Sequence, residues 1–132
     1  MKTAVILSAR QDKDTQIPYP LKPYHKDMCL MDRTIEALTA LDYTDIYLVV
    51  GGQAQMYHKY ASDHVHLVLN PDYKFTSSMG SLACAAPYIK EDFLLVEGDT
   101  FYEYKVLKAL SETKIENCFA ITEESGSGDE AF

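Results

Sequence analysis

The chain of 132 residues contains only three cysteines and no apolar run close to the length of a membrane span. The number of cysteines is odd, and they lie far apart in the sequence, at Cys29, Cys84 and Cys118, with no C-x-x-C pair. Neither a disulfide framework nor a zinc site is therefore predicted. A membrane helix needs about 20 consecutive apolar residues, so we expect no membrane contact. The start, Met1-Lys2-Thr3, does not resemble a secretory signal, and a cytoplasmic location is expected.

Basic residues are also scarce: the chain has 12 lysines and arginines and 20 acidic residues, which gives a net charge of −8. A nucleic-acid-binding surface usually carries a basic patch, so we expect no nucleic-acid partner. A small ligand with a bound divalent cation suits this charge better. Because four acids lie in the last ten residues, we divide the chain into a domain over 1–122 and an acidic terminal segment over 123–132.

The remaining sequence alternates between aliphatic runs and amphipathic segments. The pattern predicts strands over 3–8, 45–50, 65–69, 92–97 and 117–122. It predicts helices over 31–42, 53–61, 79–88 and 103–112. Such alternation indicates an α/β fold, a three-layer α/β/α sandwich with a mainly parallel sheet. Residues 9–29 contain three prolines and are predicted to be a polar loop without helix.

Two of the predicted strands end in polar residues. The first ends in Ser8 and continues into Ala9-Arg10, and the fourth ends in Glu97 and continues into Gly98-Asp99. Ligands of open α/β sheets bind at the carboxyl ends of the strands. Arg10 can hold phosphate oxygens with its guanidinium fork, and Asp99 is a suitable magnesium ligand. The alternatives are an ordinary surface loop for Arg10 and a turn or helix-capping carboxylate for Asp99.

Lys22 and a group of serines are further candidates. Lys22 lies between Pro20 and Pro23, which restrict the backbone, so its ammonium could neutralise charge on a transferring phosphoryl group. A solvated loop lysine is the alternative. The hydroxyls of Ser77, Ser78 and Ser81 could bind a base, a sugar or a phosphate, or could instead cap the helix predicted over 79–88.

Together these segments resemble the N-terminal half of a nucleotidyltransferase of the nucleotide-diphospho-sugar transferase fold. The resemblance covers residues 3–112. Within that family, the chain is similar to the 2-aminoethylphosphonate and choline-phosphate cytidylyltransferases. It rests on five motifs in the family's order: Leu7-Ser8-Ala9-Arg10, Leu21-Lys22-Pro23-Tyr24, the strand and glycine turn over 45–52, Asn70-Pro71-Asp72-Tyr73 with the serines, and Leu94-Leu95-Val96-Glu97-Gly98-Asp99. The departures are Arg10 and Asp12 in place of the family's loop glycines, and the missing second half.

The resemblance implies a truncated Rossmann-like nucleotidyltransferase fold with strand order 3-2-1-4. It implies transfer of CMP from CTP to a small phosphonate or phosphate acceptor, with Mg²⁺ and release of pyrophosphate. Arg10 and Lys22 would be catalytic and Asp99 would bind the metal. The nucleotide would be bound by Leu7, Ser8, Ala9 and Arg10 at its phosphates, and by Gly51, Ser77, Ser78 and Ser81 at its base and ribose.

Three alternatives remain open from the residues. The acceptor could be a sugar 1-phosphate, since the acceptor-binding half is missing. The chain could be a non-catalytic nucleotide-binding fragment that associates with a partner, or with itself through an exposed sheet edge. A receiver-like domain is disfavoured because the third predicted strand ends in Asn70-Pro71 where a receiver carries an acid.

Overall fold

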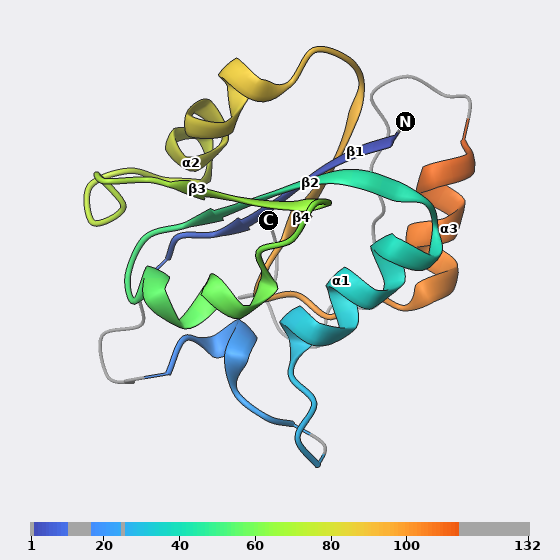
Figure 1. Ribbon diagram of the computed structural model, residues 1–132, viewed down its shortest axis with the longest axis horizontal. Coiled ribbons are helices and arrows are strands. Elements are labelled where there is room, and N and C mark those ends of the chain that lie inside the picture. Colours follow the sequence, from blue (N-terminus) through green and yellow to red (C-terminus); the bar gives the residue numbers. More distant parts are fainter. Residues whose placement is uncertain (1, 11–16, 25, 114–132) are drawn as a thin grey trace, which may run out of the picture.

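A parallel four-stranded sheet forms the centre of the protein in a computed structural model, which describes residues 2–10, 17–24 and 26–113. The strands lie in the order β3-β2-β1-β4, with bounds β1 Lys2–Ser8, β2 Tyr43–Val50, β3 Val65–Leu69 and β4 Phe93–Glu97. Every pairing is parallel. The structure therefore confirms the α/β Rossmann-like fold and the expected strand order (Figure 1).

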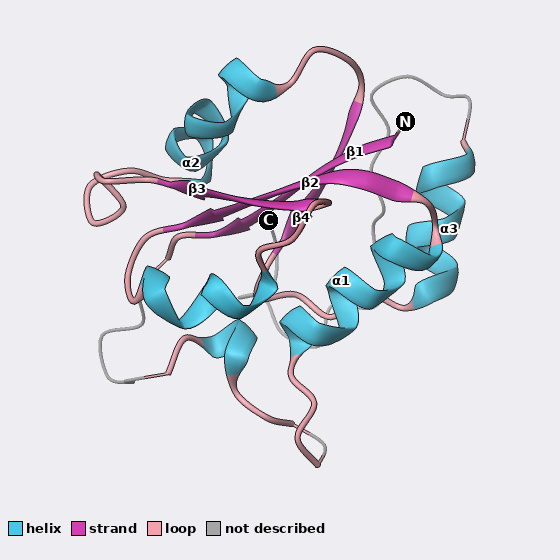
Figure 2. Cartoon of the chain, viewed as in Figure 1, coloured by secondary structure: helices cyan, strands magenta, loops and turns pink. Residues whose placement is uncertain are grey.

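Helices cover both faces of the sheet, which gives the three layers (Figure 2). One face carries α1 (Leu30–Ala40), the 3₁₀ helix η2 (Ala54–Tyr60) and α3 (Tyr104–Glu112); the other carries α2 (Ser78–Ala85) and the 3₁₀ helix η3 (Ala86–Tyr88). Alternate residues of β1 enter the two cores, Ala4 and Ile6 on the α1 side, Val5 and Leu7 on the α2 side. Burial on both faces explains the unbroken aliphatic sequence of this strand.

The prediction that residues 9–29 contain no helix is wrong over Tyr19–Leu21, which form the 3₁₀ helix η1. Pro20 is tolerated there because a first-turn residue has no intrahelical partner for its missing N–H. Leu21 is buried in the core beside α1 and fixes this turn against the domain. The predicted strand over 117–122 and the acidic segment over 123–132 lie outside the described residues.

The first turn of α1 is tied to the end of η2. The Tyr60 hydroxyl donates to Asp32 Oδ1 (2.5 Å), and the Cys29 amide donates to Asp32 Oδ2 (3.2 Å). Burial of Asp32 acts to raise its pKa, but these hydrogen bonds outweigh burial and hold the pKa below its ordinary value. The carboxylate also suits the positive end of the helix dipole. Asp32 is the acidic residue in the first turn of α1.

Replacing Tyr60 with phenylalanine should therefore destabilise the protein by about 1 kcal/mol at neutral pH, since a hydrogen bond to a partly exposed charged group is lost. Asp32 has a lowered pKa when folded, so its contribution is present above the unfolded pKa and is lost as pH falls through the folded one. Urea unfolding of both proteins at pH 7 and pH 3 measures this. An equal difference at both pH values would contradict the role of Asp32.

Among the described residues, no helix is both long enough and apolar enough to cross a membrane. The three α-helices α1, α2 and α3 are short, and each buries an apolar side chain in one of the two cores.

Candidate active site at the carboxyl ends of β1 and β4

The two central strand ends predicted to carry chemistry lie side by side. β1 pairs with β4 so that Leu7 faces Glu97, and the Gly98 amide donates to the Leu7 carbonyl (2.8 Å). Just beyond this hydrogen bond, in the segments that follow the two strands, Arg10 Nη1 lies 4.0 Å from Asp99 Oδ2. The side chains are 84% and 43% exposed, so both are accessible to a ligand. The structure thus brings the predicted phosphate-binding arginine and the predicted metal ligand together.

Two glycines allow the backbones at this edge to approach closely. A methyl group on Gly98 would collide with Ser8 Oγ and would lie 2.9 Å from the Leu7 carbonyl oxygen. A methyl group on Gly51 would lie 2.5 Å from Tyr73 Cβ and 2.7 Å from the Ala9 carbonyl oxygen. Glycine is required wherever backbone comes this near to its neighbours. Gly51 and Gly98 therefore flank the segment that the sequence predicts to bind phosphate.

Glu97 is a site residue to which the sequence alone gave no role. It lies on the same face of β4 as Phe93 and Leu95, the face that α2 shares, and Ser78 donates a hydrogen bond to its carboxylate. Burial, and then the charge of Asp99, raise the pKa of Glu97, while Ser78 and Arg10 partly offset them. The site therefore contains two carboxylates, one exposed and one half-buried, beside a single guanidinium.

Replacing Glu97 with glutamine should make the protein more stable than wild type at pH 7. The carboxamide oxygen can still accept the Ser78 hydroxyl, and the charge disfavoured by burial and by Asp99 is removed. Because the folded pKa is raised, the wild type loses stability as pH rises from the unfolded to the folded value. Urea unfolding should show the difference closing below about pH 4. A variant less stable than wild type at pH 7 would contradict this arrangement.

The three predicted serines occupy different positions. Ser77 and Ser78 are exposed at the start of α2, and Ser77 is the N-cap residue without a side-chain capping bond. The alternative of a capping hydroxyl at Ser77 is thus absent from the structure. Ser81 is only 6% exposed and accepts a hydrogen bond from Asn70 Nδ2 (3.1 Å). Ser77 and Ser78 remain accessible at this edge, whereas Ser81 belongs to the buried scaffold below it.

Lys22 follows η1, and its amide donates to the Tyr19 carbonyl (3.1 Å). Its side chain is half-buried, and it takes part in none of the ion pairs between described residues. The backbone at this position is held by buried Leu21. The structure fixes the attachment of Lys22 to the domain, and its role at the phosphates stays a prediction.

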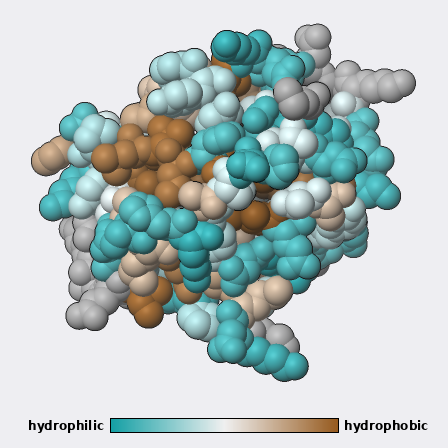
Figure 3. All heavy atoms as spheres, in the orientation of Figure 1, coloured by the Kyte–Doolittle hydropathy of each residue, from teal (hydrophilic) through white to brown (hydrophobic). Residues whose placement is uncertain are grey.

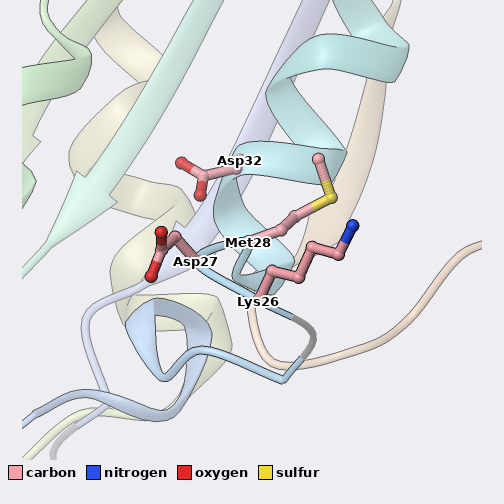
Figure 4. A pocket seen from close by; sticks show the side chains of 4 residues that line it. All are labelled: Lys26, Asp27, Met28 and Asp32. Carbon is pink, nitrogen blue, oxygen red and sulfur yellow. The ribbon is translucent and has the colours of Figure 1, made fainter.

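A shallow open depression lies near the N-terminus of α1 and is lined by Lys26, Asp27, Met28 and Asp32 (Figure 4). In the close-up the Lys26 ammonium and the Asp27 carboxylate point to opposite sides. Asp32 is already engaged by Tyr60 and Cys29. These side chains do not converge on a common point, so the depression adds no reactive group to the site.

The donors at the strand ends fit a magnesium ion. Within 2–10, 17–24 and 26–113, no cluster of three or more histidine, cysteine, aspartate or glutamate residues could hold a metal. Magnesium is usually bound by one or two carboxylates together with substrate phosphates. Asp99, with Glu97 two residues before it in the chain, supplies the one or two carboxylates that magnesium needs beside substrate phosphates. Binding of the metal would then depend on the phosphate ligand.

A distant similarity to a known protein bears on this site. No protein-family model matches the sequence. Over 99 residues the chain is 29% identical to a protein named CMP-5'-(3-aminopropyl)phosphonate synthase from Streptomyces rubellomurinus (strain ATCC 31215). The match covers 71% of this chain and 16% of the Streptomyces protein, so the chain spans about a sixth of that relative's length. The similarity supports nucleotidyl transfer in general terms.

Proposed function

We propose that this chain forms the nucleotide-binding part of a cytidylyltransferase that transfers CMP from CTP to a small phosphonate and releases pyrophosphate. The observation that carries the proposal is the pairing of Arg10 with Asp99 at the carboxyl ends of the two central strands. A cation for phosphate and a carboxylate for magnesium are the two groups that phosphoryl transfer needs there. The name of the Streptomyces relative favours CMP and an aminoalkylphosphonate acceptor.

The proposed reaction forms a bond from an acceptor oxygen to the α-phosphorus of CTP and breaks the bond to the pyrophosphate oxygen. Catalysis of such a displacement is mainly positioning and charge neutralisation. Arg10 and the amides of residues 8–10 would hold the β- and γ-phosphates. Lys22 would stabilise the α-phosphate as charge shifts. Magnesium, held by Asp99 with Glu97 nearby, would neutralise phosphate charge when bound.

The exposed Arg10–Asp99 pair is compatible with this exchange of partners. Ion pairs between exposed side chains contribute about 0–1 kcal/mol, and this pair is long at 4.0 Å. A triphosphate with magnesium offers stronger partners to both groups, since charge-assisted bonds from arginine to phosphate can be bidentate. The ion pair therefore holds both side chains close to their proposed positions, and breaking it to bind the ligand costs little free energy.

Because the chain spans 16% of the Streptomyces protein, a second candidate function is CTP binding without turnover. Pyrophosphate release from CTP and magnesium tests both, with 3-aminopropylphosphonate, 2-aminoethylphosphonate or glucose 1-phosphate as acceptor. Release with a phosphonate supports the proposal, and release with glucose 1-phosphate alone points to a sugar-phosphate acceptor. CTP binding without release supports the second candidate. Neither binding nor release would contradict both.

A further inference from the structure

Large apolar side chains are exposed from the end of β3 to the first turn of α2, at the edge of the sheet that carries the candidate site. Phe75 is 87% exposed, Met79 71% and Leu69 58%. Figure 3 shows hydrophobic residues grouped on the surface around β3, with hydrophilic residues on either side. Contiguous exposed apolar surface usually marks a binding site. Phe75 is the most exposed large apolar residue among those described.

Phe75 is nevertheless carried by a firmly hydrogen-bonded turn. The Asp72 carbonyl accepts from the amides of Phe75 (2.9 Å) and Thr76 (3.1 Å). The side chain of Asn70, itself 2% exposed, holds both ends of the turn, accepting from the Asp72 amide (3.0 Å) and donating to Thr76 Oγ1 (2.9 Å). The backbone of this turn is therefore fixed, and it presents an aromatic ring to solvent.

The same turn packs directly against the candidate nucleotide site. Tyr73 Cβ lies against Gly51, which also faces the Ala9 carbonyl oxygen of the predicted phosphate loop. On the other side, Thr76 lies against Gly80 of α2 so closely that a methyl group there would collide with it. The turn is thus wedged between the end of β2 and the start of α2. An aromatic ring at this position lies at the same edge as Arg10 and Asp99.

Residues with hydroxyl groups follow this ring along the chain. Thr76, Ser77 and Ser78 follow Phe75 directly and are exposed, and Ser78 continues the contact to Glu97 beside Asp99. A flat apolar face bordered by hydrogen-bonding groups suits a ligand with a planar ring and polar edges.

We propose that Phe75 is the stacking platform for the nucleobase of the bound nucleotide. The inference rests on the proposed function, which supplies a nucleoside triphosphate at this edge, and adds a residue that binds its base. Aromatic rings attract one another in offset-stacked arrangements. Any of the bases can stack on an aromatic side chain in this way. Stacking therefore supplies affinity, while the neighbouring hydroxyls read the edge of the base.

The absence of tryptophan from the chain provides a direct test. Phe75→Trp places one fluorescent indole at the proposed platform, and CTP with magnesium should quench it. Tripolyphosphate with magnesium, which has no base, should leave the emission unchanged. Tyr88→Trp is the matched control: Tyr88 is 55% exposed but follows α2, toward the amino ends of the strands. Its emission should not respond to either ligand.

Affinity measured by calorimetry completes the test. Phe75→Ala should weaken CTP binding by about 5- to 150-fold and leave tripolyphosphate binding and the unfolding temperature unchanged. Equal CTP affinity in wild type and Phe75→Ala, or no quenching at residue 75 while CTP binds, would overturn the platform and leave the proposed function standing. No binding of CTP by the wild type would overturn both.

Discussion

Replacing Asp99 with asparagine is expected to weaken magnesium-dependent CTP binding by about 100-fold or more. Loss of groups that merely support a metal ligand costs 10–100-fold, and Asp99 is proposed to be the ligand itself. The folded state should be little affected, because the carboxylate is 43% exposed and its ion pair is with an arginine that is 84% exposed. Isothermal titration with CTP, with and without magnesium, measures the effect.

The matched control is Asp92→Asn. Asp92 is exposed just before β4, at the opposite end of the same strand, and its substitution removes the same charge. That variant should bind CTP like the wild type. Asp99→Asn binding CTP with wild-type affinity and wild-type magnesium dependence would contradict the proposed metal site, whereas equal losses in both variants would indicate a general charge effect.

Replacing Gly98 with alanine is the substitution in the strand ends for which we expect the largest loss of stability, about 1–3 kcal/mol, as for overpacked sites. The new methyl group would meet Ser8 Oγ and the Leu7 carbonyl oxygen. The backbone oxygen cannot move without loosening the bond it accepts from the Gly98 amide. CTP binding should fall as well, because the same displacement separates Arg10 from Asp99. Urea unfolding and calorimetry measure the two effects.

A double substitution separates the two contacts. Ser8 Oγ is buried and has no hydrogen-bond partner among the described residues, so Ser8→Ala alone should change stability by only a few tenths of a kcal/mol. Combined with Gly98→Ala it should recover part of the loss, since the hydroxyl contact disappears and the carbonyl contact remains. A strictly additive double variant would show that the methyl group does not meet the Ser8 side chain.

Strand positions were predictable because these strands are short apolar runs that end in polar residues or a glycine turn. The predicted strands over 3–8, 65–69 and 92–97 agree with β1, β3 and β4 to within a residue, and β2 begins two residues earlier than predicted. The type of helix was harder to predict. The segment over 53–61 is a 3₁₀ helix, and the helix predicted over 79–88 changes to 3₁₀ after Ala85. Apolar spacing over so few residues does not separate the two helix types.

The candidate site was predictable where it depends on topology. Arg10 and Asp99 follow strands that a parallel sheet must bring to one edge. The scaffold below was not predictable, because Asn70 and Ser81 are eleven positions apart and meet only when α2 packs on the sheet. The exposure of Phe75 was not predictable, because phenylalanine is usually buried, and only the structure shows its ring in solvent.

The most direct test of the central claim is the stabilisation of the wild-type chain by each of the four nucleoside triphosphates, with and without magnesium. A ligand that binds only the folded state raises the unfolding temperature, and at equal concentrations the ligand that binds more tightly raises it further. We expect the largest rise with CTP and magnesium, a smaller one with CTP alone, and weaker effects with the other nucleotides. No rise with any nucleotide, in the presence or absence of magnesium, would contradict a nucleotide site at the ends of β1 and β4.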